Sequence, residues 1–366
     1  MVIYYGIFFI LVILAFIEVL GIKIKKHFAL LIIILFFLLA AFRWEIGTDW
    51  ESYLSNFRIA NDMGLIEYIK VFSGFYEYGY VILTGIIGFL TNNYNFYLSF
   101  VALIIFILTY SRLFSRSKLI YISLLAIFCF SFAYMFSVPR QGIAIAVVFY
   151  SIKYIEEKSK FKFIIAVLIA TMFHSSALIF LPAYFIFYLK ISVKKYLIGM
   201  FLALFCGIAA VEILSFINNM GILPGKISER ISSYLTTKYV DNASRALIVD
   251  ILIKTLTRGF VIVLIFLFLL KIKNKDENLN GYINFYYVST YLYIISFFTS
   301  EVFSRLSIYY EEVQYILYSY VFFFAKKNIR ILLFFVFVVF LFLKLYARLN
   351  SGYMEEFIPY KSILNL

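Results

Sequence analysis

Long apolar segments alternate with short polar loops along almost the whole chain. A helix of about 20 residues crosses the ~30 Å hydrocarbon core of a bilayer, and several of these segments approach that length. Inside the bilayer a helix satisfies its own backbone hydrogen bonds, so helices are the expected form. The apolar segments are 2–21, 28–42, 78–91, 95–111, 119–137, 141–155, 163–173, 176–189, 196–217, 247–270, 283–300, 306–324 and 331–345. The pattern predicts an all-α polytopic integral membrane protein with about 12–13 transmembrane or half-membrane helices.

Short loops rich in Lys and Arg predict how these helices are oriented, because such loops stay in the cytoplasm. The basic clusters lie at residues 23–26, 112–118, 153–162, 190–195, 271–275 and 326–330. Residues 1–366 are predicted to form a single transmembrane domain. If all of the basic clusters are cytoplasmic, its polar outer loops span residues 43–77 and 218–246, and its outer C-terminal tail spans residues 347–366.

Two regions contain segments that cannot all be full crossings. Two full crossings between residues 78 and 111 would put the basic cluster at 112–118 on the outside, so either 78–91 or 95–111 is predicted to be a half-helix. The region 163–189 has basic residues on both flanks, which predicts two short helices meeting near His174-Ser175-Ser176. His174 is then expected in a hollow below the outer surface, because polar groups at membrane depth need protein or water around them.

Composition supports a membrane protein and excludes several other classes. Hydrophobic residues make up 64% and charged residues 14% of the chain, whereas soluble domains have roughly a quarter charged residues. Two cysteines and two histidines exclude a disulfide framework and a His-rich or thiolate metal site. The net charge of +13 is typical of cytoplasmic Lys and Arg in a membrane protein, so no nucleic-acid partner is expected.

The stretch "FRWEIGTDWESY" gathers polar residues directly behind an apolar segment. Thr48 and Glu51 have the spacing of a capping box, which predicts an amphipathic interfacial helix from Asp49 to Ile59. That structural interpretation does not explain Arg43 and Asp49 at the mouth of a membrane helix. We therefore treat Arg43 as a candidate substrate ligand and Asp49 as a candidate base.

The stretch "VPRQG" places Arg140 at the outer end of a predicted helix, where basic residues are uncommon. A guanidinium can hold a phosphate or a carboxylate with two parallel hydrogen bonds, and the N-terminus of a helix adds partial positive charge. The alternative is an Arg that extends to the lipid headgroups. For His174 the alternative is a hydrogen-bonded core residue.

Further charges lie within or beside other apolar segments. Asp250, Lys254 and Arg258 have i, i+4, i+8 spacing, so Asp250 and Lys254 could pair and leave Arg258 as the candidate. A second predicted helix face carries Arg305, Tyr309 and Glu312, where pairing of Arg305 with a Glu is the structural alternative. Ionisable residues inside a membrane are costly and are functional candidates by default. Several Arg residues around an outward-facing cavity would suit an anionic, lipid-linked substrate.

Four motifs in succession resemble the EpsG/Wzy group of polysaccharide polymerases. They are "FRWEIGTDWESY", "YEYGYVIL", "VPRQGIAIAVVFYSIKYI" and "FKFIIAVLIATMFHSSALIFLPAYF", and the closing "FIPYKSIL" is also similar. Residues 190–300 match only in hydropathy. The resemblance implies a GT-C-like integral-membrane glycosyltransferase in the bacterial cytoplasmic (inner) membrane, with its active site facing the periplasm or exterior. It also implies that the substrate is an undecaprenyl-diphosphate-linked oligosaccharide and that membrane lipids, a chain-length regulator and a flippase are partners.

In that reaction a sugar hydroxyl attacks an anomeric carbon and a lipid diphosphate leaves. Fixed cations stabilise such a leaving group, and a base removes the hydroxyl proton. We expect His174 to be the base, with Asp49 as the alternative, and we expect no metal or other cofactor. The expected substrate-binding residues are Arg43, Glu77, Arg140, Gln141, Arg258, Arg305, Tyr309 and Glu312. An O-antigen ligase-like enzyme, a lipid-linked oligosaccharide flippase or other transporter, and a membrane acyltransferase are the competing interpretations.

Overall fold

The computed structural model describes residues 1–47, 49–130, 138–220, 255–256, 258–269, 276–296, 301–350 and 357–365. Within these ranges the chain is helical, and its only extended pairing is an isolated bridge between Arg43 and Ser362. Four described helices are long and apolar enough to cross a membrane: α1 (Val2–Val19), α6 (Tyr94–Arg116), α12 (Val193–Asn219) and α19 (Lys327–Leu349). The prediction of an all-α polytopic membrane protein is therefore confirmed.

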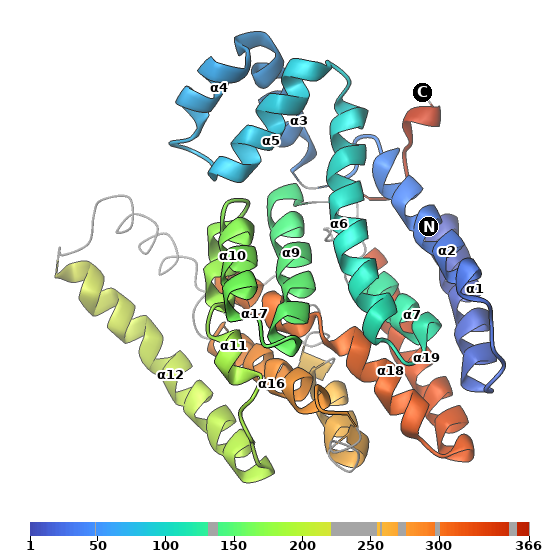
Figure 1. Cartoon of the computed structure of the whole chain (residues 1–366). Coiled ribbons are helices and arrows are strands. Elements are labelled where there is room, and N and C mark those ends of the chain that lie inside the picture. Colours follow the sequence, from blue (N-terminus) through green and yellow to red (C-terminus); the bar gives the residue numbers. More distant parts are fainter. Residues whose placement is uncertain are drawn as a thin grey trace. The chain divides into compact units, whose positions relative to one another are not determined.

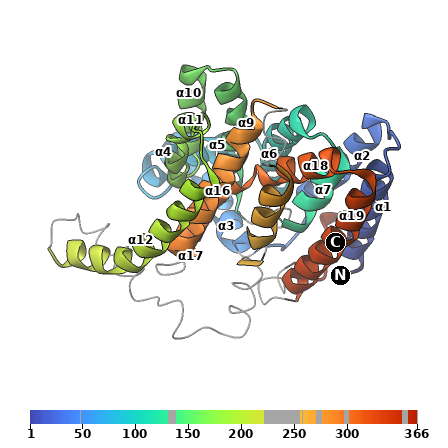
Figure 2. The same ribbon diagram turned by 90° about the horizontal axis from the view of Figure 1, so that it is seen from below.

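The chain divides into two compact units. The first contains Met1–Leu178 and Tyr315–Leu366, and the second contains Ile179–Gln314. In the first unit α1 lies beside α7 (Ile120–Phe130) and α19, while α2 (Lys26–Ala41) lies beside α6 (Figures 1 and 2). Aromatic side chains join these helices, as where Phe36 of α2 stacks on Phe128 of α7.

A three-helix module is formed by the two helices of the first predicted outer loop and the helix that follows them. It consists of α3 (Trp50–Met63), α4 (Leu65–Phe72) and α5 (Tyr78–Leu90), which pack on one another near one end of α6 (Figure 1). Inside it, the Asn56 side-chain amide donates to the hydroxyls of Tyr68 and Tyr80 at 2.7 and 2.8 Å. The interfacial helix expected from Asp49 is α3, which begins at Trp50; Thr48, its predicted cap, lies outside the described residues.

Either segment 78–91 or segment 95–111 was predicted to be a half-helix, and helix α5, in the first of them, is the shorter helix. It has 13 residues, or roughly 20 Å, whereas α6 has 23 residues. A bilayer core of ~30 Å needs the longer of the two. Segment 78–91 is therefore the half-helix candidate.

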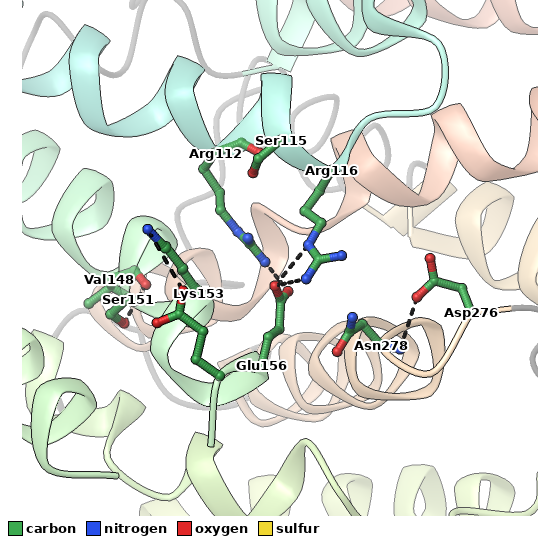
Figure 3. A network of polar contacts seen from close by, with 10 residues as sticks. Arg112, Ser115, Arg116, Val148, Ser151, Lys153, Glu156, Asp276 and Asn278 are labelled. Carbon is green, nitrogen blue, oxygen red and sulfur yellow. Dashed lines mark hydrogen bonds and ion pairs between the residues drawn. The ribbon is translucent and has the colours of Figure 1, made fainter. Parts of the chain in front are cut away.

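Helices α6 and α9 (Pro139–Glu156) are fastened at one end by buried charge (Figure 3). Glu156 at the end of α9 forms ion pairs with both Arg112 and Arg116 of α6, and the Nε–Oε2 bond from Arg116 is 2.8 Å. The side chains of Arg112 and Glu156 are almost wholly buried. A buried carboxylate needs such compensation, so the ion pairs fix how α9 lies against α6.

The expected break near His174 is present. Helix α10 (Lys160–Thr171) packs against α9 and ends just before it, and a short 3₁₀ helix (Ser175–Phe180) follows. Only the four-residue α11 (Ala183–Ile186) comes after that, so segment 176–189 does not form one regular helix. Segment 306–324 is likewise divided into α17 (Glu301–Glu311) and α18 (Gln314–Phe324).

The second unit is built around α16 (Leu279–Ser296), which packs against α12 and α17. Tyr196 of α12 stacks on Tyr287 at a ring distance of 3.8 Å. The Asn284 amide donates to the carbonyls of Phe187 and Leu189, at 3.3 and 2.8 Å. These bonds tie the chain after α11 to α16. A π-helical turn, Ile265–Leu269, belongs to the same unit.

The C-terminal segment is bound to the first two helices. The Trp44 amide donates to the carbonyl of Lys361 (3.1 Å), and the Ile363 amide donates to the carbonyl of Phe42 (3.0 Å). The hydroxyl of Tyr360 donates to the carbonyl of Leu39 at 2.8 Å. The described part of the expected C-terminal tail, residues 357–365, is therefore packed on the body of the first unit.

Candidate functional site

Glu77 is the meeting point of three segments that are far apart in the sequence. It is the N-cap residue of α5. Its Oε2 accepts a hydrogen bond from the Arg140 guanidinium of α9 at 2.9 Å. Its Oε1 accepts from the Ser175 amide at 3.1 Å and from the Ser175 hydroxyl at 3.4 Å. One carboxylate therefore joins Arg140 to the turn that carries His174.

Arg140 is held on several sides and yet remains partly open. It is the second residue of α9, behind Pro139, which suits a first helical turn because proline lacks the amide donor that would be unpaired there. Its Nε donates to the Tyr53 hydroxyl at 3.3 Å. Its guanidinium also lies over the rings of Tyr76 and Tyr80, at 5.0 and 5.6 Å. The side chain is still 26% exposed.

Helices α5 and α10 approach each other closely, which brings Glu77 within hydrogen-bonding distance of Ser175. The Gly79 amide donates to the carbonyl of Met172, at the end of α10, with a length of 2.7 Å. A Cβ atom at position 79 would lie only 2.8 Å from that carbonyl oxygen. Glycine is therefore required for this contact. Sequence reasoning did not single out Gly79, although the motif "YEYGY" contains it.

His174 lies in the break between α10 and the 3₁₀ helix and is half-buried. Its Nδ1 forms a 2.6 Å hydrogen bond with the Ser176 hydroxyl. The break is held by the His174 amide, which donates to the carbonyl of Ala170, and by the Ala177 amide, which donates to the carbonyl of His174. The imidazole is thus oriented by its own turn, and Ser175 of that turn contacts Glu77.

The electrostatics of Glu77 keep it ionised at neutral pH. Burial alone would raise its pKa. The hydrogen bond from the Ser175 amide and the electrostatic interactions with Arg140 and His174 outweigh burial and hold the pKa of Glu77 below its usual value. A carboxylate in that state is a poor base but a good partner for a fixed cation.

Tyr53 links Arg140 to the start of α3, where Asp49 lies. Burial raises the pKa of the Tyr53 hydroxyl; Arg140 opposes this shift, and the charge of Asp49 reinforces it. Asp49 is the N-cap residue of α3, its side chain makes no capping bond, and it is half-buried. Asp49 is thus one helical turn from a residue that contacts Arg140. The roles of Tyr53, Tyr76 and Tyr80 were not predicted, although aromatic residues flank Glu77 in "YEYGY".

Arg43 has a different setting from Arg140. It is 4% exposed, and its Nη1 donates to the carbonyl of Ala40 at the end of α2, with a length of 2.7 Å. Its backbone pairs with Ser362. These contacts fasten the end of α2 and the C-terminal segment. Gln141, which follows Arg140, is 2% exposed inside the first unit.

The remaining candidates belong to the second unit. Arg258 is buried, forms an ion pair with Glu311 at 2.6 Å and donates to the Ser307 hydroxyl at 2.8 Å. Its guanidinium also lies 3.8 Å from the centre of the Tyr293 ring. Its proposed neighbours Asp250 and Lys254 lie outside the described residues.

The expected stripe of Arg305, Tyr309 and Glu312 differs in the structure. Arg305 is exposed and makes no hydrogen bond or ion pair within the described ranges. Tyr309 and Glu312 are buried, at 1% and 2% exposure. Helix α17 ends at Glu311, so the helical spacing does not extend to Glu312. The Glu that pairs with an Arg is Glu311, and its partner is Arg258 rather than Arg305.

Comparison with known proteins identifies the family. Curated proteins and solved structures gave no match. The model of the EpsG family matches residues 26–362, which include the three helices of the α3–α5 module, Arg140 and the His174 turn. With a match over nearly its whole length, this chain belongs to the EpsG family.

Proposed function

We propose that this chain is an integral-membrane glycosyltransferase that polymerises oligosaccharide repeat units carried on undecaprenyl diphosphate at the outer face of the membrane. Membership of the EpsG family supports a role in polysaccharide polymerisation in general terms. The observation that carries the finer proposal is the partly exposed Arg140 guanidinium held beside the His174 turn by Glu77. A cation and a candidate base in one place are what transfer from a lipid diphosphate needs.

The proposed reaction forms one bond and breaks one. The acceptor sugar hydroxyl attacks the anomeric carbon of the growing glycan, and a new glycosidic C–O bond forms. The bond between that carbon and the diphosphate oxygen breaks, and its electron pair stays with the lipid diphosphate. The hydroxyl proton passes to His174, or to Asp49 as the alternative base. No nucleotide sugar is needed, because the donor is already activated.

Arg140 is suited to stabilise the diphosphate as negative charge develops on it. A guanidinium fixed in advance stabilises such charge without reorganising during the reaction. The hydrogen bonds of Arg140 use Nη1 and Nε, and its Nη2 makes no hydrogen bond within the described part of the chain. That nitrogen is available to donate to a phosphate oxygen of the substrate. Glu77 itself is not a candidate base, since it is paired and ionised.

The first test of the proposal is the glycan profile of a strain that lacks this chain. A polymerase predicts that single repeat units still reach the outer surface, either on the lipid or transferred from it, while the ladder of longer products disappears. A flippase predicts that no repeat unit reaches the surface. A profile without any surface repeat unit would therefore favour the transporter and contradict the polymerase.

Arg140→Lys tests the site itself. Lysine keeps the charge but donates from a single point, so it cannot hold a phosphate with two parallel hydrogen bonds. We expect long-chain product to fall by at least about 100-fold, measured as the ladder on a gel, while the protein is still inserted. Arg58→Lys is the matched control, since Arg58 is an exposed Arg of the neighbouring α3. A normal ladder from Arg140→Lys would overturn the assignment of Arg140 to the diphosphate.

A further inference from the structure

The two carboxylate oxygens of Glu77 have different partners. Oε2 accepts from Arg140, and Oε1 accepts from both donors of Ser175. Ser175 directly follows His174. The side chain of Glu77 therefore sets the separation between the guanidinium and the turn that holds the imidazole, although it belongs to neither segment.

The charge of Glu77 argues against a direct role in holding an anionic substrate. A carboxylate 2.9 Å from Arg140 cancels part of the positive charge that would attract a diphosphate, and it repels the diphosphate itself. The Glu77 and Arg140 side chains are 20% and 26% exposed, so an arriving anion would meet both. Glu77 therefore weakens the binding of the lipid diphosphate substrate before the reaction.

The benefit of Glu77 is that it fixes the conformation of the Arg140 side chain. An Arg side chain loses substantial rotamer freedom when it is fixed, and a guanidinium that must be fixed during the reaction makes the transition state less accessible. Here Glu77 holds Nη1, Tyr53 holds Nε, and the rings of Tyr76 and Tyr80 cover the guanidinium. The direction of Nη2 is thereby set before any substrate arrives.

From these contacts, and resting on the proposed function, we propose that Glu77 is a positioning residue and not a substrate ligand. It holds Arg140 and the His174–Ser176 turn in one arrangement, at the cost of weaker binding of the lipid diphosphate. This replaces the expectation from sequence that Glu77 contacts the substrate. Ser175 becomes part of the same arrangement through its two hydrogen bonds to Glu77.

Glu77→Gln separates the two effects. Glutamine keeps the shape and an oxygen that can accept from Ser175, but it loses the charge that pairs with Arg140. We expect kcat for repeat-unit addition to fall about 100-fold, because Arg140 is no longer held in place. We expect KM for the lipid-linked donor, and Kd for undecaprenyl diphosphate, to fall about three- to fivefold, because a repelling charge is gone. Both are measured on purified protein in lipid nanodiscs.

Two further variants complete the design. Glu67→Gln removes a carboxylate of the same module that is exposed on α4, so it controls for net charge and should leave kcat and KM unchanged. Glu77→Asp keeps the charge on a side chain too short to reach both Arg140 and Ser175. It should lower kcat while KM stays within about twofold of wild type. It also provides the test if Glu77→Gln does not fold.

The outcomes distinguish this inference from the proposed function. A raised KM or Kd in Glu77→Gln would make Glu77 a substrate ligand and overturn the positioning role, and so would an unchanged kcat. If wild-type protein makes no polymer from lipid-linked repeat units, the proposed function fails, whatever the variants do. If wild type polymerises and only the Glu77 variants depart from expectation, the function stands and the positioning role falls.

Discussion

Among individual residues, Glu77 accepts hydrogen bonds from both Arg140 and Ser175, so three polar groups at the ends of different apolar segments come together. A charged group near the membrane needs a partner, so its presence in the sequence signals a contact. The identity of the partner is a tertiary property, which is why the pairing of Arg258 with Glu311 was not foreseen. The roles of all these residues in substrate binding stay predictions.

His174→Ala tests the base at the same scale. Removing a general base lowers the rate by about 10²–10⁴-fold, so single repeat units should accumulate at the expense of long chains. The readout is the ratio of single units to polymer in the glycan profile. Ser176→Ala, which removes the hydroxyl bonded to Nδ1, should have a smaller effect.

The alternative base is addressed by the same assay. Asp49→Asn should leave polymer if His174 is the base, because Asp49 is then a helix N-cap and no more. Unchanged polymer from His174→Ala together with its loss in Asp49→Asn would exchange the two roles.

Among the helices, the apolar segments predicted most elements but not every break. Helix α5 was expected as one of two possible half-helices, and the interruption after α10 was expected from the basic flanks. The division between α17 and α18 was not, because the sequence around residue 312 carries no proline or glycine to mark it. Packing decides such a break, and packing is not visible in a single apolar run.

The docking of α5 on α10 yields a prediction about Gly79. A methyl group in Gly79→Ala would meet the Met172 carbonyl at 2.8 Å, so the helices must move apart. We expect a loss of stability of about 1–3 kcal/mol and a loss of polymer larger than that destabilisation explains, because Glu77 moves with α5. Thermal unfolding and the glycan ladder measure the two effects.

Gly74→Ala is the matched control for Gly79→Ala. Nothing lies within 4 Å of a Cβ atom at Gly74, so this variant should behave as wild type in both assays. Equal behaviour of the two alanine variants would contradict the importance of the α5–α10 contact.

At the level of the whole molecule, hydropathy and loop charge were sufficient for the class of protein. They predicted a helical membrane protein, and the motifs predicted the family that the comparison identified. Neither could predict that residues 357–365 pack on the first two helices. Those contacts join the two ends of the chain through backbone hydrogen bonds, which hydropathy does not encode.

Deletion of residues 357–366 tests how much the first unit depends on that segment. The truncated protein loses the bonds of Lys361 and Ile363 to the backbone after α2, and those of Tyr360 and Phe357 to Leu39 and Tyr4. At about 0.5–1.5 kcal/mol for each bond, the unfolding temperature should fall by about 5–10 °C. Lys361→Ala removes only an exposed ion pair with Glu45 and should unfold within about a degree of wild type. Equal unfolding temperatures for the deletion and wild type would contradict the expected contribution.

The double ion pair at the far end of α9 bears on the reaction through the stiffness of that helix. Glu156 and Arg140 are the two extremities of one 18-residue rod, ~24 Å apart along its axis. A rod clamped at one tip cannot turn or slide freely at the other. The ion pairs of Glu156 with Arg112 and Arg116 therefore restrict rotation and sliding of α9. Their loss would change the orientation of the Arg140 guanidinium relative to Glu77, although the substitution lies far from the proposed substrate.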